Sequence, residues 1–163
     1  FTQIDCEMAF VTRNDVLSTF EGLTKHLFKT VLDMTLSDFP LMSYEDAIKR
    51  YGSDKPDLRF GMAFCELNDI AKGKGLGVFD DAELIVGICA EGQAGNYSNK
   101  DINELTEWMK RPQIGAKGLV YVKINEDGSI KSSVGKFFTD DDLKGWANKF
   151  GAKNGDLIFI LSG

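Results

Sequence analysis

The first residues of the chain place polar side chains at alternate positions. Gln3, Asp5 and Glu7 follow Phe1 with single residues between them. Side chains alternate between the two faces of a β-strand, so this pattern predicts a strand over residues 1–10 with the three polar groups on one face. Two carboxylates and an amide on one face could bind a polar ligand. By itself, however, the pattern favours a strand that is merely half-exposed.

A glycine-rich segment offers a second candidate for ligand binding. Gly73, Gly75 and Gly77 occupy alternate positions within residues 72–79. A dinucleotide-binding loop requires G-x-G-x-x-G between a strand and a helix, and a P-loop requires Gly-Lys-Ser/Thr. The segment has neither pattern, so we interpret it as a flexible turn that leads into a strand.

The cysteines and the single histidine give no catalytic or metal-binding pattern. Cys6, Cys65 and Cys89 are far apart in sequence, and none has a second Cys or His at a ligand spacing. We therefore expect reduced thiols, no metal site and a cytoplasmic protein. His26 has no partner at a motif spacing, so we assign it a structural or exposed position.

Composition narrows the class of protein. The 163 residues include 43% hydrophobic and 27% charged residues, which is typical of a globular protein. No apolar run is long enough for a transmembrane helix, and residues 1–10 lack the features of a signal peptide. The net charge of −6 argues for weak or no nucleic-acid binding by the chain itself.

Helix and strand patterns order the rest of the chain. Capping residues and apolar stripes predict helices that begin after Thr12 or Asn14, after Ser43, after Ser98 and after Thr139. The Ser98 helix has the stripe Ile102, Leu105, Trp108 and Met109, so Trp108 is expected in the core. Apolar runs predict strands over residues 83–90, 118–124, 130–134 and 157–161, and Asp127-Gly128 predicts a hairpin between the second and third of these.

This order of elements predicts an α+β fold, a two-layer domain with helices packed on a mixed, largely antiparallel sheet. The polar segment 51–59 is rich in turn-forming residues, and we interpret it as a boundary. The predicted domains are therefore 1–61 and 62–163.

Three segments resemble one family of enzymes. Residues 1–10, with Phe1 and Asp5 in an F-x-x-x-D pattern, resemble the second strand of motif 2 in class II aminoacyl-tRNA synthetases of the aspartyl type. Residues 51–59 resemble a segment of bacterial aspartyl-tRNA synthetases, and residues 115–123 resemble the GAD domain inserted in those enzymes. The resemblance covers the whole chain. It assigns residues 1–61 to a partial catalytic domain and residues 62–163 to the GAD domain.

The resemblance implies an activity for the parent enzyme. Such enzymes activate aspartate with ATP and magnesium and then transfer it to tRNA, and they are homodimers. By resemblance, Phe1 stacks on the adenine, Gln3 and Asp5 line the substrate pocket with Asp5 near the substrate ammonium, and Glu7 shares their face. An aromatic ring can cover a purine without reading its edge. The substrate-binding residues expected in the parent are therefore Phe1, Gln3, Asp5 and Glu7.

The sequence lacks other parts that the resemblance would require for catalysis. It contains no motif 2 arginine with its ATP-contacting loop, and no motif 3 segment. We therefore expect a catalytically incompetent, monomeric fragment with no bound ATP, magnesium or other metal. Its GAD portion would contact the tRNA acceptor arm or support the catalytic domain. The alternative is a stand-alone GAD-type module that binds tRNA or protein, as in tRNA-dependent amidotransferases.

Overall fold

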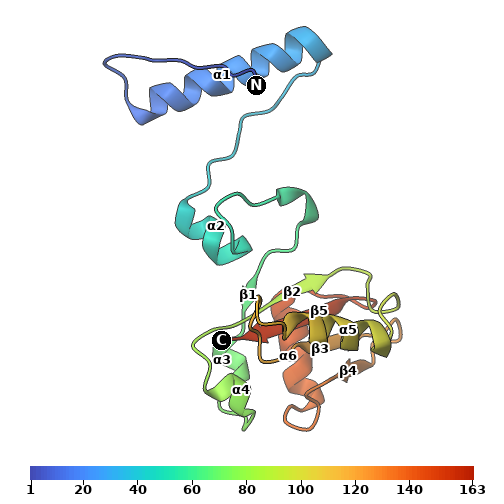
Figure 1. The fold of residues 1–163 in the computed structure, drawn as a ribbon. Coiled ribbons are helices and arrows are strands. Elements are labelled where there is room, and N and C mark those ends of the chain that lie inside the picture. Colours follow the sequence, from blue (N-terminus) through green and yellow to red (C-terminus); the bar gives the residue numbers. More distant parts are fainter. The chain divides into compact units, whose positions relative to one another are not determined.

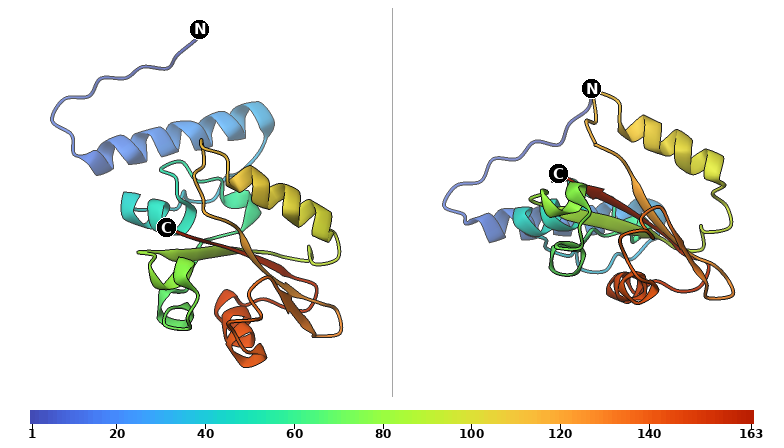
Figure 2. Two further views of the ribbon diagram at one scale, coloured as in Figure 1. Left: turned by 60° about the horizontal axis from the view of Figure 1, so that its bottom comes forward. Right: turned by 90° about the horizontal axis from the view of Figure 1, so that it is seen from below.

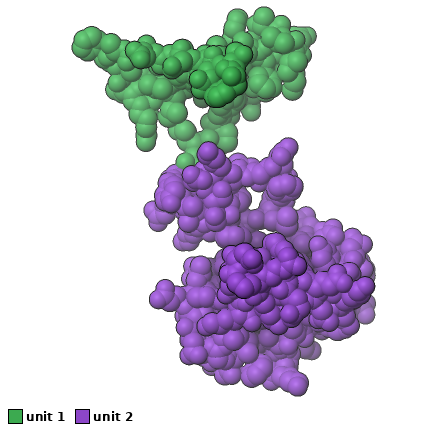
Figure 3. Space-filling model, viewed as in Figure 1, with its two compact units in different colours: residues 1–42 green, residues 43–163 purple.

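The computed structural model describes all residues from 1 to 163 (Figure 1). The chain forms two compact units, residues 1–42 and residues 43–163, which are coloured separately in Figure 3. All of the β-structure belongs to the second unit.

The first unit contains one long helix. Helix α1 spans Arg13–Leu32 and begins at a capping box, in which Thr12 accepts from the Asp15 amide and the Asp15 carboxylate accepts from the Thr12 amide. This confirms Thr12, rather than Asn14, as the N-cap. No residue of α1 is buried. Residues 1–12 form neither helix nor strand.

The expected strand over residues 1–10 is therefore wrong for this structure. A strand is stable only when its backbone N–H and C=O groups pair with another strand. The first unit offers no such strand, because its only regular element is α1. The alternation of polar residues is compatible with a strand, but it does not show which other strand would pair with residues 1–10.

The second unit opens with two short helical elements. Helix α2 spans Tyr44–Tyr51, with Ser43 as the N-cap and Gly52 in the left-handed conformation at its C-terminal end. The 3-10 turn η1 follows at Leu58–Phe60. The start of α2 after Ser43 was correctly predicted from the residue type.

A five-stranded sheet forms the centre of the second unit. The strand order is β1-β2-β5-β3-β4, and every neighbouring pair is antiparallel. The C-terminal strand β5 lies between β2 and β3 and alternates its side chains between two apolar clusters. The strands are β1 (Cys65–Glu66), β2 (Ile85–Ala90), β3 (Val120–Ile124), β4 (Ile130–Ser132) and β5 (Leu157–Ser162).

Helices pack on both faces of this sheet. The left view of Figure 2 shows α5 (Asn99–Met109) on one side, and α3 (Asn68–Ala71), α4 (Gly77–Asp80) and α6 (Asp140–Phe150) on the other. The larger core lies under α3, α4 and α6, where Trp146 is fully buried against the rings of Phe79 and Phe138. The smaller core lies under α5, where Ile102 packs with Leu157 and Phe159.

The α+β class is confirmed, and four details differ from expectation. The sheet is wholly antiparallel rather than mixed, and the α5 side adds a second helical layer. Trp108 is 48% exposed, because it lies off the stripe of Ile102 and Leu105 and therefore beside the smaller core rather than in it. The segment 72–79 is a turn that leads first into α4 and only then into β2.

None of the helices combines the length and the apolar character that crossing a bilayer would require.

Candidate functional site

The four residues expected to bind substrate lie in the segment before α1. Phe1, Gln3, Asp5 and Glu7 are all exposed, and the ring of Phe1 has no covering neighbours. The structure therefore leaves these side chains on one extended, solvated segment and does not gather them around a cavity. Their expected roles rest on the sequence pattern and stay predictions.

The segment 51–59 is held by local contacts rather than by a ligand-binding arrangement. The Asp57 carboxylate accepts from the Arg59 amide at 3.0 Å and from Arg59 Nε at 2.9 Å. The Arg59 guanidinium holds the pKa of Asp57 below its usual value. The two side chains form an ion pair with each other, and this pair stabilises the turn.

Gly52 and Phe64 connect this segment to the sheet. Gly52 has a φ of +67°, and a Cβ there would lie 2.9 Å from the Phe64 ring. The Phe64 amide donates to the Arg50 carbonyl at 2.7 Å. Phe64 is thereby fixed immediately before β1, and the residue is 40% exposed.

The glycine-rich loop does bind an anion, but the anion belongs to the chain. The Gly73 and Gly75 amides donate to the two carboxylate oxygens of Asp80, at 2.7 and 3.0 Å. Both glycines have positive φ, which turns successive N–H groups toward one point. An Asp80 carboxylate occupies the position that a phosphate would need, which explains the glycines without a nucleotide.

A buried carboxylate was missed by the sequence analysis. Asp156 is only 6% exposed and accepts from the Gly92 amide at 2.8 Å and the Lys153 amide at 2.7 Å. The Cys89 thiol also lies 3.7 Å from this carboxylate. Asp156 thus joins the loop after β2 to the turn before β5. The only signal in the sequence is the Asn-Gly-Asp turn that directly precedes an apolar strand.

Lys123 is the other buried charge that the pattern did not indicate. It lies on β3, is 9% exposed, and donates to the Tyr97 carbonyl just before α5. Hydrogen bonds with Ser98 lower the pKa of Asp101, and the Lys123 charge adds a minor contribution in the same direction. A lysine among apolar residues of a strand could have indicated this role, since such a strand position is usually covered.

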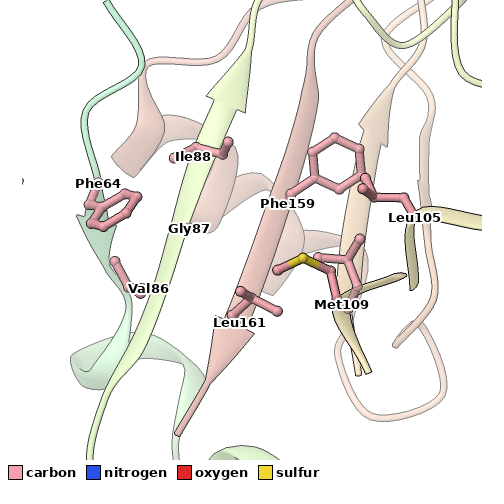
Figure 4. Close-up of a pocket in the computed structure, with 9 residues that line it drawn as sticks. Phe64, Val86, Gly87, Ile88, Leu105, Met109, Phe159 and Leu161 are labelled. Atoms are coloured by element: carbon pink, nitrogen blue, oxygen red, sulfur yellow. The ribbon is translucent and has the colours of Figure 1, made fainter. Parts of the chain in front are cut away.

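An apolar hollow lies on the α5 face of the sheet. It encloses about 320 Å³ and is lined only by apolar residues and one glycine. Figure 4 shows Phe64 on one side, Leu105 and Met109 on the other, and side chains of β2 and β5 between them. We call this hollow the sheet trough; its residues are Phe64, Val86, Gly87, Ile88, Leu105, Met109, Leu119, Phe159 and Leu161.

The thiols and the histidine lack the features of a reactive centre. Burial raises the pKa of the Cys65 thiol, and burial together with the Asp156 carboxylate raises the pKa of Cys89 to about 12. A thiol with a raised pKa is a poor nucleophile at neutral pH. His26 is exposed on α1. The structure contains no group of three or more His, Cys, Asp or Glu side chains that could hold a metal ion.

Comparison with known proteins identifies the family. The family described as tRNA synthetases class II (D, K and N) matches residues 1–160. The chain is similar to the aspartate–tRNA ligase of Flavobacterium psychrophilum, with 58% identity over 163 residues. It is also similar to the ligase of Bacteroides fragilis, at 58% identity, and to that of Phocaeicola vulgatus, at 59%.

These alignments cover 100% of this chain but 28% of each relative. The chain therefore corresponds to part of a longer enzyme in these bacteria. The relatives favour the synthetase interpretation over a stand-alone module of an amidotransferase. The chain belongs to the class II tRNA synthetases of the D, K and N group, within which it matches a bacterial-type aspartate–tRNA ligase along its whole length.

Proposed function

We propose that residues 1–163 are part of an enzyme that activates aspartate with ATP and transfers it to tRNA in the cytoplasm. The observation that supports this function is the 58% identity to aspartate–tRNA ligases across all 163 residues. At such identity over a whole chain, a different reaction would require changes in parts of the enzyme outside this segment. The enzyme would act as a homodimer.

Within this proposal, the segment before α1 supplies part of the substrate pocket. Phe1 would stack on the adenine of ATP, and Asp5 would bind the ammonium of aspartate, with Gln3 and Glu7 beside them. All four are exposed in residues 1–163, which leaves them free to contact the rest of the enzyme and its substrates. A strand partner from the rest of the enzyme would also satisfy the backbone of residues 1–10.

Substitutions in the complete enzyme test these roles. Loss of a charged hydrogen bond costs about 1.5–3 kcal/mol, so Asp5→Asn should raise the KM for aspartate about tenfold or more in ATP–pyrophosphate exchange. Phe1→Ala should raise the KM for ATP and affect the KM for aspartate less. Thr2→Ala is the matched control, since Thr2 alternates with the proposed binding residues and should leave both constants unchanged. Unchanged constants in Asp5→Asn would remove Asp5 from the site.

Residues 1–163 alone should not catalyse the reaction. Adenylate formation depends on cations that stabilise the phosphates in the transition state, and magnesium is one of them. The chain has no group of three or more His, Cys, Asp or Glu side chains that could hold a metal ion, so a magnesium site would need groups from outside residues 1–163. Measurable ATP–pyrophosphate exchange by residues 1–163 alone would contradict this expectation.

We further propose that residues 62–163 are the GAD domain and that residues 1–61 belong to the catalytic domain. In the complete enzyme, the GAD domain would contact the tRNA acceptor arm or steady the catalytic domain. Deleting residues 62–161 should then reduce aminoacylation. A loss confined to the KM for tRNA would indicate a tRNA contact, whereas a loss in ATP–pyrophosphate exchange would indicate support of the catalytic domain. Wild-type kinetics in both assays would remove either role.

A further inference from the structure

The sheet trough is an uncovered apolar hollow on the α5 face of the sheet. Helix α5 covers this face beside β3 and β5, where Ile102 packs on Leu157 and Phe159. It does not extend over β2, so Val86 and Ile88 stay half-exposed. On the far side the face is bordered by the fixed ring of Phe64.

The apolar surface continues from the sheet trough along the segment before β1. A neighbouring hollow of about 790 Å³ shares Ile88, Leu105 and Phe159 with the trough. Its rim includes Phe60 at 67% exposure and Met62 at 40%, together with the polar side chains of Arg59, Glu91 and Gln93. Exposed apolar side chains with polar side chains at their rim are typical of an interaction site.

The lining of the sheet trough limits what can bind there. It has no charged side chain and no polar side chain. A phosphate backbone needs basic side chains, and a polar small molecule needs a few well-placed hydrogen-bonding groups. The trough offers neither, so tRNA, ATP and aspartate are poor candidates. A volume of about 320 Å³ suits a few aliphatic or aromatic side chains.

We infer that the sheet trough is the docking site for an apolar segment of the same synthetase polypeptide, outside residues 1–163. This inference rests on the proposed function, because it requires that the chain be part of the longer enzyme. The relatives are more than three times as long as the aligned chain, so most of such an enzyme lies outside residues 1–163. Domain interfaces within one chain bury about 600–1,500 Å², which the trough and its rim can nucleate.

The same features argue against a second copy as the occupant. A stable dimer needs about 1,200–2,000 Å² of total buried surface with good complementarity. In a symmetric contact each trough would have to receive protruding side chains of the other copy, yet the trough residues themselves line a hollow. An intramolecular partner needs less surface, because tethering already holds it close.

Photo-crosslinking in the complete enzyme tests the inference. The photoreactive amino acid p-benzoylphenylalanine would replace Met109 in the trough, and in a control variant it would replace Lys136, which is exposed in the loop before α6. Mixing isotopically light and heavy enzyme separates crosslinks within a chain from those between chains. Docking predicts that the Met109 position forms crosslinks within the chain to residues outside 1–163, several-fold more than the Lys136 position. The inference would be overturned if the Met109 position formed no crosslinks. It would also be overturned by crosslinks that are only between chains, only within residues 1–163, or only to bound tRNA.

A footprinting measurement on the unsubstituted enzyme avoids any effect of the bulky probe. Phe64 and Phe137 are similarly exposed in this structure, at 40% and 47%, but only Phe64 lines the trough. Docking predicts that hydroxyl radicals modify Phe64 several-fold more slowly than Phe137 in the complete enzyme. Equal rates would contradict docking. Neither readout depends on aminoacylation, so an enzyme that crosslinks as expected but does not charge tRNA would refute the proposed function and leave the docking site standing.

Discussion

Gly52 shows how one residue can be required for two separate reasons. Its φ of +67° lies in the left-handed region, and a Cβ would also meet the Phe64 ring at 2.9 Å. Gly61 has nearly the same φ, +68°, but open space around it. The two glycines therefore separate the cost of backbone conformation from the cost of a collision.

We predict that Gly52→Ala lowers the free energy of unfolding more than Gly61→Ala does. Placing a non-glycine residue in the left-handed region costs about 1–2 kcal/mol, and both variants incur this cost. Only Gly52→Ala must also displace the Phe64 ring. Urea denaturation of the chain compares the two variants directly. Equal losses would mean that the ring moves aside freely, and Phe64 would then be a weak wall of the sheet trough.

Asp156 is a buried carboxylate whose loss should lower stability without any change in apolar packing. Asp156→Ala would remove the carboxylate that accepts hydrogen bonds from the Gly92 and Lys153 amides. Gly92 and Lys153 are themselves exposed, and a hydrogen bond to a charged group is worth about 1.5–3 kcal/mol, so we expect a loss on the order of 2 kcal/mol in the free energy of unfolding.

Asp127→Ala is the matched control for Asp156→Ala. Asp127 also accepts from a backbone amide, that of Ser129 at 2.9 Å, but it lies in the exposed hairpin turn. Water can replace that bond, so its loss should stay below about 1 kcal/mol. Urea denaturation measures both variants, and similar losses would show that the Asp156 loop opens to water at little cost.

At the scale of elements, the N-terminal cap of helix α6 contains a carboxylate, Asp142, whose protonation should change the stability of the chain. The pKa of Asp142 is lowered from 3.8 to about 2, chiefly by the hydrogen bond from Lys74 and then by those from Thr139. Because the folded-state pKa is depressed, this contribution is fully present above the unfolded-state value. It is lost as the pH falls from about 4 toward 2.

We predict that Asp142→Asn weakens the dependence of stability on pH between about 4 and 2. The urea midpoint of the variant should fall less on acidification than that of the unsubstituted chain. Asp141→Asn is the control, because the Asp141 side chain is 95% exposed and outside the cap. If Asp142→Asn and the unsubstituted chain lost the same stability over this range, the Lys74 and Thr139 contacts would not determine the Asp142 titration.

Structural features that depend on nearby residues were predicted from the sequence more successfully than features that depend on distant partners. The caps Ser43, Ser98 and Thr139 are confirmed, since a cap is determined by residues within one turn. The Asp127-Gly128 hairpin is confirmed for the same reason. The strand over residues 1–10 failed because its pairing partner is not determined by those residues.

In the candidate site, too, the features that depend on distant residues could not be predicted from the sequence. The glycine loop was interpreted as a turn, but its contact with the Asp80 carboxylate could not be predicted without the fold of the loop. The sheet trough brings together Phe64, β2, β5 and α5, which are distant in sequence. No periodicity within one element indicates that α5 leaves part of the sheet uncovered. The roles of Phe1, Gln3, Asp5 and Glu7 stay predictions, because the structure does not surround them with a pocket.

At the scale of the whole molecule, the two compact units differ in how they are stabilised. Every residue of the two apolar cores lies between Leu67 and Ile160. The first unit has one helix of 20 residues with no buried residue. Hydrophobic burial, the main source of folding free energy, is therefore concentrated in residues 43–163.

We predict that residues 43–163 fold cooperatively without residues 1–42, and that residues 1–42 alone are only weakly helical. An isolated helix of about 20 residues gains little without tertiary packing, even with a good cap. Circular dichroism during urea titration should show a sigmoidal transition for residues 43–163 and a small, gradual change for residues 1–42. The capping variant Thr12→Ala gives the control for the short chain, since it should remove most of the remaining helix signal if that signal comes from α1. A gradual transition in residues 43–163 would show that the two apolar cores are insufficient for cooperative folding, and that the unit depends on parts of the synthetase that lie elsewhere.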